Sequence, residues 1–162
     1  MDITPAVVSE EYERVRGRAD IPGHITIIRG RLGDLFGVDV DPVDTQMYQS
    51  AVDDVFADGD VGVNVATLVR VLRDLDCEDD YPGFVVDEFL GRRLAATIAG
   101  GEPYRLLAEA TFHFADVHID DTDATAGGDD LTAALVAGFQ TRIPGWSWTE
   151  TESPFRVDLL RE

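Results

Sequence analysis

The chain has 162 residues, of which 44% are hydrophobic, and it carries a formal net charge of −19. That hydrophobic fraction is ordinary for a globular domain and too high for a disordered chain, and no apolar run approaches the roughly 18 residues that span a bilayer. The acidic start Met1-Asp2-Ile3 lacks the basic and apolar parts of a secretory signal, and the lone Cys77 excludes an internal disulfide. We therefore predict a single cytoplasmic domain over residues 1–162 with no membrane partner.

Two segments at the start of the chain differ in how clearly they predict structure. Thr4-Pro5, followed by Glu10 and Glu11, predicts a helix that begins with proline in its first turn and ends near Gly17. Residues 24–36 alternate imperfectly, as a strand does, and also place apolar residues at helical spacing. The helical set is Ile25, Ile28, Leu32, Leu35 and Phe36. Periodicity leaves this segment open between helix and strand.

Three amphipathic helices are predicted next. The first opens at Asp41-Pro42 and ends within residues 57–60, the second is capped by Asn64, and the third runs from Pro82 to Gly100-Gly101. The residues expected to face inward are Met47, Tyr48, Ala51, Val52, Val55 and Phe56 in the first, Val65, Leu68, Val69, Leu72 and Leu75 in the second, and Val86, Phe89, Leu90, Leu94 and Ile98 in the third.

The pattern changes in residues 103–119, where apolar and polar residues alternate from Tyr104 to Phe114. Alternation favours a half-buried strand, although a helix remains the alternative because Leu107, Ala110, Phe114 and Val117 also align. A further helix is marked by Leu131, Leu135, Phe139 and Ile143 and stopped by Pro144-Gly145, and residues 146–148 and 155–159 are expected to form two closing strands.

The order of these elements predicts an α+β fold. Its helical N-terminal two-thirds would pack on a small antiparallel sheet formed mainly by the C-terminal third. A mostly α fold is the alternative, and it follows if residues 103–119 are helical.

The charge is unusual in kind as well as in size. All 13 basic residues are arginine, and the 32 acids comprise 22 aspartates and 10 glutamates. Self-repulsion at this charge is strong in dilute buffer, but at molar salt the Debye length falls to about 3 Å and most of the repulsion disappears. Such a composition resembles that of proteins from salt-accumulating halophiles. Nucleic-acid mimicry and calcium binding fit less well, because the acids are spread from Asp2 to Glu162.

Two Arg-Gly-Arg segments are the most unusual local feature. Arg16 and Arg18 flank one glycine, and Arg29 and Arg31 flank another. Guanidinium groups offer forked donors suited to phosphate or carboxylate, so these four residues are candidates for contact with an anion or nucleic acid. Pairing with the many acids of this chain is the simpler interpretation, and the net charge opposes binding to nucleic acid.

His113, Asp116 and His118 form a weak candidate metal site. Positions 113 and 118 have opposite parity on a strand and lie far apart around a helix, and the segment matches no zinc signature. A bulge near Asp116, with His24 as a third ligand, would be needed to bring them together. We therefore predict no metal and no cofactor.

Trp146 and Trp148 share one face of a predicted strand and are candidates for contact with a ligand or partner. Because no catalytic motif is present in the sequence, we predict a non-enzymatic module that binds a small molecule or takes part in protein interaction and regulation, with a protein partner or homo-oligomer compatible with it. One alternative is a nucleic-acid-associated regulator that uses the segments Arg16–Arg18 and Arg29–Arg31. Another is a small metal-dependent enzyme around His113 and His118.

Overall fold

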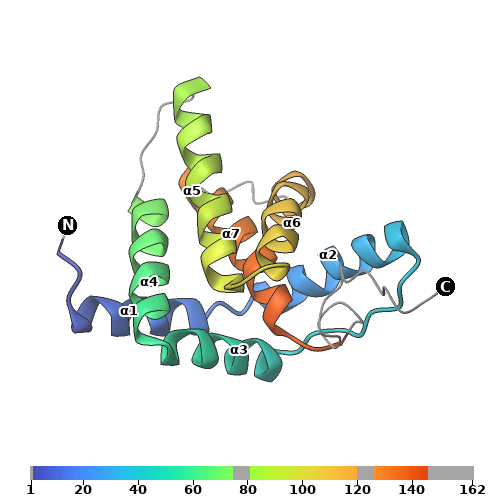
Figure 1. The fold of residues 1–162 in the computed structure, drawn as a ribbon, viewed down its shortest axis with the longest axis horizontal. Helices are drawn as coiled ribbons and strands as arrows, with labels where there is room; N and C mark the ends of the chain where they lie inside the picture. Colours follow the sequence, from blue (N-terminus) through green and yellow to red (C-terminus); the bar gives the residue numbers. More distant parts are fainter. Residues whose placement is uncertain (1, 75–80, 120–125, 146–162) are drawn as a thin grey trace.

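The computed structural model describes residues 2–74, 81–119 and 126–145, and these stretches contain helices, turns and loops but no strand (Figure 1). The α-helices are α1 (Pro5–Arg16), α2 (Ile21–Phe36), α3 (Thr45–Ala57), α4 (Gly59–Asp74), α5 (Tyr81–Ala99), α6 (Tyr104–His118) and α7 (Ala126–Phe139), and the 3-10 helix η1 (Gln140–Arg142) follows α7 directly.

The predicted α+β fold is wrong, because the segment expected to form its first strand is helix α6. The buried residues of α6 are Leu107, Ala108, Thr111, Phe112 and Ala115. Leu106, which the strand pattern placed with the core, is 53% exposed. Of the alternating apolar residues, Ala108 and Phe112 are buried against the neighbouring helices α5 and α7, whereas Leu106 and Ala110 are exposed, so the alternation came from apolar residues on the solvent side of α6. The mostly α alternative describes these stretches, while the predicted strands at 146–148 and 155–159 lie outside the described residues.

Residues 24–36 are also helical, within α2, where Ile25, Ile28 and Leu32 are buried.

Two predicted helix starts were misplaced. α3 begins at Thr45, because the Asp44 carboxylate accepts a hydrogen bond from the backbone of Met47 at 2.8 Å.

α4 begins five residues before the predicted cap at Asn64, because Asp58 accepts a hydrogen bond from the backbone of Val61 at 3.2 Å and so supports the first turn. On α5, Leu94 and Ile98 are buried as expected, but Val86 and Phe89 face outward.

Helix α7 is the centre of the bundle. Every residue from Leu131 to Gln140 is buried, and α7 packs against α2, α4, α5 and α6 (Figure 1). A helix that is apolar on all sides is expected in such a position, because no face of it meets water. α7 is therefore the helix around which α2, α4, α5 and α6 pack.

Two glycines allow neighbouring helices to approach closely. A Cβ atom at Gly138 of α7 would lie 2.8 Å from Cβ of Ile98 on α5. A Cβ atom at Gly91 of α5 would lie 2.5 Å from the ring of Phe112 on α6. Both distances are shorter than carbon atoms tolerate, so the spacing of α5, α6 and α7 depends on the absence of these side chains.

Arg29 of α2 is fully buried and caps the 3-10 helix η1, which follows the central helix directly. Its guanidinium group donates hydrogen bonds to the backbone carbonyls of Gln140, Ile143 and Pro144. Gln140 belongs to η1, and Ile143 and Pro144 follow it directly, where helical hydrogen bonding ends. Arg29 therefore satisfies two buried carbonyls, those of Gln140 and Ile143, and a third at the exposed Pro144.

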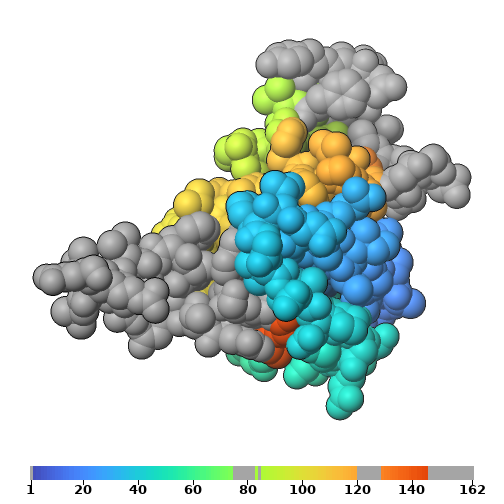
Figure 2. Space-filling model, turned by 90° about the vertical axis from the view of Figure 1, so that its right-hand side faces the viewer, coloured from blue at the N-terminus to red at the C-terminus, as the bar shows by residue number. Residues whose placement is uncertain are grey.

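The chain that follows η1 is held against the segment between α2 and α3. The backbone N–H of Asp41 donates to the carbonyl of Gly145 at 2.7 Å, and Gly145 has a φ of 121°, which favours glycine. In Figure 2 the last described residues, in red, lie beside the cyan and teal residues that follow α2. This contact and the Arg29 cap together join α2 to the end of η1.

No helix in the described parts of the chain is both long enough and apolar enough to cross a bilayer.

We expect Gly138→Ala to lower the free energy of unfolding by about 2 kcal/mol, because the added methyl group forces Ile98 and α5 away from α7. Gly30→Ala on α2 is the matched control, because a Cβ atom there meets nothing within 4 Å. Helix propensity and chain entropy predict that this control stabilises the protein by about 0.5–1 kcal/mol. Denaturant unfolding of both variants in molar KCl measures the difference, and equal stability of the two would contradict the close packing of α5 on α7.

Candidate functional site

A groove lies between α1, the end of α3 and the start of α4. It has a volume of about 710 Å³, is open to solvent and is mainly apolar. The residues that line it are Ile3, Thr4, Pro5, Val8, Ser9, Tyr12, Asp53, Phe56, Ala57, Gly59, Gly62 and Val63. This volume lies within the range of about 300–1,000 Å³ that small-molecule sites occupy.

Local sequence explains how the walls of the groove form. The Thr4 hydroxyl accepts a hydrogen bond from the backbone of Val7 at 3.3 Å, and Pro5 occupies the first position of α1. At the opposite wall, the turn from α3 to α4 is sharp because Gly62 packs on the backbone of Phe56, where a Cβ atom would lie 3.2 Å from the Phe56 carbonyl. Gly59 has no side chain, which widens the groove at this turn.

One end of the groove carries a polar cluster. The Tyr12 hydroxyl donates to Oδ1 of Asp53 at 2.5 Å, and Nε of Arg16 donates to the same oxygen at 2.9 Å. The Tyr12 ring also packs edge-on against Phe56, with ring centroids 5.4 Å apart. The hydrogen bond from Arg16, supported by the one from Tyr12, lowers the pKa of the Asp53 carboxyl below its ordinary value. The groove thus presents two aromatic rings and an ionised carboxylate.

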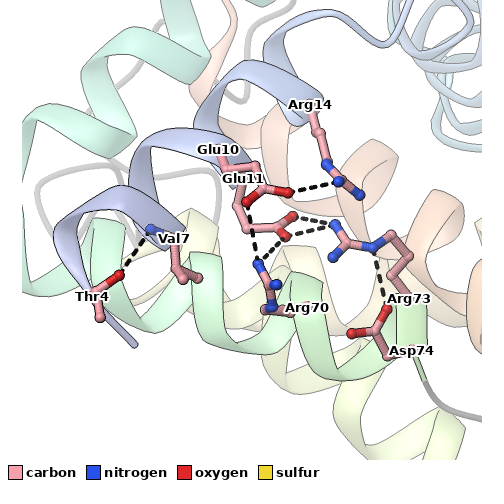
Figure 3. Close-up of polar contacts among 8 residues, drawn as sticks. All are labelled: Thr4, Val7, Glu10, Glu11, Arg14, Arg70, Arg73 and Asp74. Carbon is pink, nitrogen blue, oxygen red and sulfur yellow. Dashed lines mark hydrogen bonds and ion pairs between the residues drawn. The ribbon is translucent and has the colours of Figure 1, made fainter. Parts of the chain in front are cut away.

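A network of ion pairs behind the groove joins α1 to α4 (Figure 3). Glu11 of α1 is fully buried, and its carboxylate lies 3.2 Å from Nη1 of Arg70 and 2.6 Å from Nη1 of Arg73, both on α4. Its neighbour Glu10 is about half exposed and pairs with Arg14 at 2.6 Å. Because Glu11 receives donors from two arginines, its burial is compensated, and it fixes α1 against α4 at the position that shapes the groove.

A second cavity of about 270 Å³ lies beside this network and is lined in part by Arg14, Arg18 and Arg73. Each of these arginines already holds a carboxylate, with Arg18 bound to Asp20 at 2.8 Å. Arg18 also donates to the Thr132 hydroxyl of α7 at 2.9 Å. This cavity is therefore lined by satisfied ion pairs.

The two Arg-Gly-Arg segments do not converge. Arg16 binds Asp53 beside the groove, Arg18 binds Asp20 and Thr132, and Arg29 is buried under η1. Arg31 is exposed on α2. Three of these four arginines thus face acceptors of the chain itself. A shared role in anion binding stays a prediction that this arrangement does not favour.

The histidines of α6 also lie apart. Nδ1 of His113 lies 3.4 Å from Glu88 on α5, and the ring of His118 packs on Phe114. Among the described residues, no group of three His, Cys, Asp or Glu side chains converges in a way that could hold a metal ion. Trp146 and Trp148, the aromatic candidates, lie outside the residues that the structure describes.

A buried carboxyl cluster lies where α5, α6 and α7 meet. Asp130 of α7 is buried, hydrogen-bonded to Asp116 of α6 and close to Asp87 of α5, which is also buried. Burial, together with the negative charge of Asp116, raises the pKa of Asp130 to about 8. At neutral pH Asp130 therefore holds a proton and donates it in the hydrogen bond to Asp116.

Sequence reasoning missed the groove and the buried Glu11. The groove is assembled from three helices, so no single segment carries its pattern. Glu11 offered one usable signal, because it lies four residues before Val15 and four after Val7, on a face of α1 that also carries apolar residues.

We expect Glu11→Gln to lower the free energy of unfolding by about 2 kcal/mol, since it leaves Arg70 and Arg73 without their shared buried carboxylate while their partial exposure limits the loss. The adjacent Glu10→Gln is the control, and it should cost less than about 0.5 kcal/mol because the Glu10 side chain is about half exposed and its contact with Arg70 is long, at 3.8 Å. Chemical denaturation at neutral pH provides the measurement. Similar losses in both variants would show that Glu11 does not clamp α1 to α4.

The Asp130 carboxyl predicts a pH dependence of stability. Its folded pKa is about 8 and its ordinary value is 3.8, so between these values the folded state binds a proton that the unfolded state has lost. Stability should fall as the pH rises from about 4 to about 8 and then level off. In Asp130→Asn this contribution disappears. The unfolding free energy of the wild type should therefore fall relative to that of the variant as the pH rises over that range. A constant difference from pH 5 to pH 9 would contradict the raised pKa.

Comparison with known proteins gives one match. No curated protein and no solved structure matches the chain. The family described as "Domain of unknown function (DUF7984)" matches residues 1–159, which include all the helices described above. The chain therefore belongs to the family described as a domain of unknown function, DUF7984.

Proposed function

We propose that this protein is a non-enzymatic binding module whose groove between α1, α3 and α4 takes a small amphipathic organic molecule. The single observation that carries the proposal is the open, mainly apolar groove of about 710 Å³ with one ionised carboxylate, that of Asp53, in its lining. Pockets of this kind bind through apolar contact and use a few polar groups to orient the ligand.

The polar end of the groove suggests the chemistry of the ligand. Asp53 is about two-fifths exposed and accepts hydrogen bonds. The faces of Tyr12 and Phe56 attract positive charge. The charge of −19 also disfavours an anionic ligand. We therefore propose a ligand with an apolar body and an ammonium or similar donor group.

Binding is favoured over catalysis by the state of Asp53. A general base works best when its pKa lies near the working pH, whereas Arg16 and Tyr12 hold the pKa of Asp53 below its ordinary value. An acceptor that is held in place by two donors is suited to orienting a ligand.

We further propose that the protein is of the halophile type and works in a salt-rich cytoplasm. The acidic, lysine-free composition supports it. Under molar salt, long-range attraction is screened, so a cationic group must contact Asp53 directly to be recognised. This is the arrangement that the groove offers.

The experiment measures binding of the neutral, apolar dye Nile red in about 3 M KCl, a concentration that screens surface charge. Val63 lines the groove and is 42% exposed, and we expect Val63→Gln to weaken dye binding roughly fivefold through loss of about 1 kcal/mol of apolar contact. Val117→Gln on α6 is the matched control, because Val117 is 67% exposed and lies outside the groove. Equal binding by the two variants would exclude the groove as the dye site.

Displacement of the dye tests the polar end. A short alkylamine should compete better than the alkanoate of the same length, and Asp53→Asn should remove that preference while leaving dye affinity within about twofold. Equal competition by amine and alkanoate on the wild-type protein would contradict the proposed donor group and leave only an apolar site.

A further inference from the structure

The outward face of α5 combines exposed apolar residues with two exposed arginines. Its exposed residues are Val85, Val86, Phe89, Arg92 and Arg93. The spacing i, i+1, i+4, i+7, i+8 places all five on one stripe of the helix. In a chain with 32 acids, this stripe contains none. We call these five residues the α5 stripe.

The stripe is uncovered because the other sides of α5 make its contacts within the bundle. Leu94, Ala95 and Ile98 are buried on the opposite side, where α5 packs against α4, α6 and α7. Figure 1 shows the N-terminal half of α5 extending beyond α6 and α7. Phe89, at 58% exposure, is the aromatic residue at the middle of the stripe. Exposed aromatic residues of this kind are enriched at protein interfaces.

The charges of the stripe restrict the partner. Arg92 and Arg93 form no ion pair with any residue that the structure describes. A carboxylate beside an apolar centre would complement these charges, and Glu88 at the border of the stripe is such a group.

We propose that the α5 stripe is the contact between two copies of this chain, with the two α5 helices antiparallel about a two-fold axis at Phe89. The stripe is complementary to itself in this arrangement. Its apolar end at Val85 and Val86 lies about 5 Å before Phe89, and its basic end at Arg92 and Arg93 lies about 5 Å after it, given a rise of 1.5 Å per residue. The antiparallel axis therefore places the aliphatic stems of the arginines over the valines of the other copy.

The same axis pairs opposite charges. Glu88 borders the stripe and its side chain is about half exposed. In the antiparallel pair, Glu88 of one copy lies on the same side of the contact as Arg92 of the other, about 3 Å apart along the helix direction. Two symmetric ion pairs therefore flank the Phe89 contact.

The dimer is expected to be weak and dependent on salt. One helix stripe buries less than the roughly 800 Å² per partner of a standard interface, which suggests a dissociation constant of roughly 10–100 μM. Repulsion between two chains of charge −19 opposes it in dilute buffer, and molar salt removes that repulsion. This contact lies on other helices than the groove, so it stands or fails independently of the proposed function.

Sedimentation velocity of the full chain in about 3 M KCl, over a range of protein concentrations, tests the proposal. We expect a monomer–dimer equilibrium that Phe89→Asp weakens at least tenfold, because it puts a charge at the centre of the contact. Leu106→Asp on α6, at a site that is 53% exposed, is the matched control and should dimerise as wild type does. A monomer at all concentrations, or a dimer that Phe89→Asp leaves intact, would overturn the proposal.

Two further measurements test the geometry. Arg92→Glu and Glu88→Arg should each weaken the dimer, and the double variant should recover it. In a Cys77→Ser background, Phe89→Cys should form an intermolecular disulfide on mild oxidation, because the two-fold axis brings the two copies of this position together. Val117→Cys in the same background is the control. A double variant that stays monomeric, or equal crosslinking of the two cysteine variants, would exclude the antiparallel arrangement.

Discussion

The structure depends on satisfying the polar ends of a helix that has no face toward water. The chain is buried from Leu131 through the end of α7 to Gln140, so buried carbonyls where the helix ends need a partner within the protein. Arg29 supplies donors from α2 to the carbonyl of Gln140 in η1 and to those of Ile143 and Pro144 just after it. This single contact ties α2 to α7 and η1. The remaining helices then pack around α7 according to its small residues, above all Gly138 beside Ile98.

The distribution of arginine follows from the same need for donors. A lysine presents a compact charge, whereas a guanidinium group can bind several acceptors at once. Arg29 binds three carbonyls, and Arg70 and Arg73 share the buried Glu11. In a chain without lysine, these arginines are used at internal positions where helices meet. The abundant acids outnumber them, and most of the surface is left to be neutralised by ions of the solvent.

The sequence predicted the positions of most helices better than it predicted the contacts between them. α1 ended where Gly17 indicated, and the buried residues of α3 and α4 largely followed the helical pattern. The error at α6 arose because Leu106 and Ala110 are apolar but exposed, so that together with the buried Ala108 and Phe112 they produced an alternating pattern. Arg29 could not be distinguished from an exposed arginine, because its acceptors lie more than 100 residues away. The groove was equally hidden, since it exists only once α1 and the α3–α4 turn are placed together.

Because the carboxyl of Asp130 is protonated in the folded protein, folding takes up protons from the solution. Near pH 7 this group is ionised in the unfolded chain and mostly protonated in the native chain, so folding at this position takes up hydrogen ion from the buffer. The heat released on folding therefore includes the ionisation heat of whichever buffer supplies that ion. Calorimetric enthalpies of this protein measured in phosphate and in Tris will differ for this reason, although its packing is the same in both.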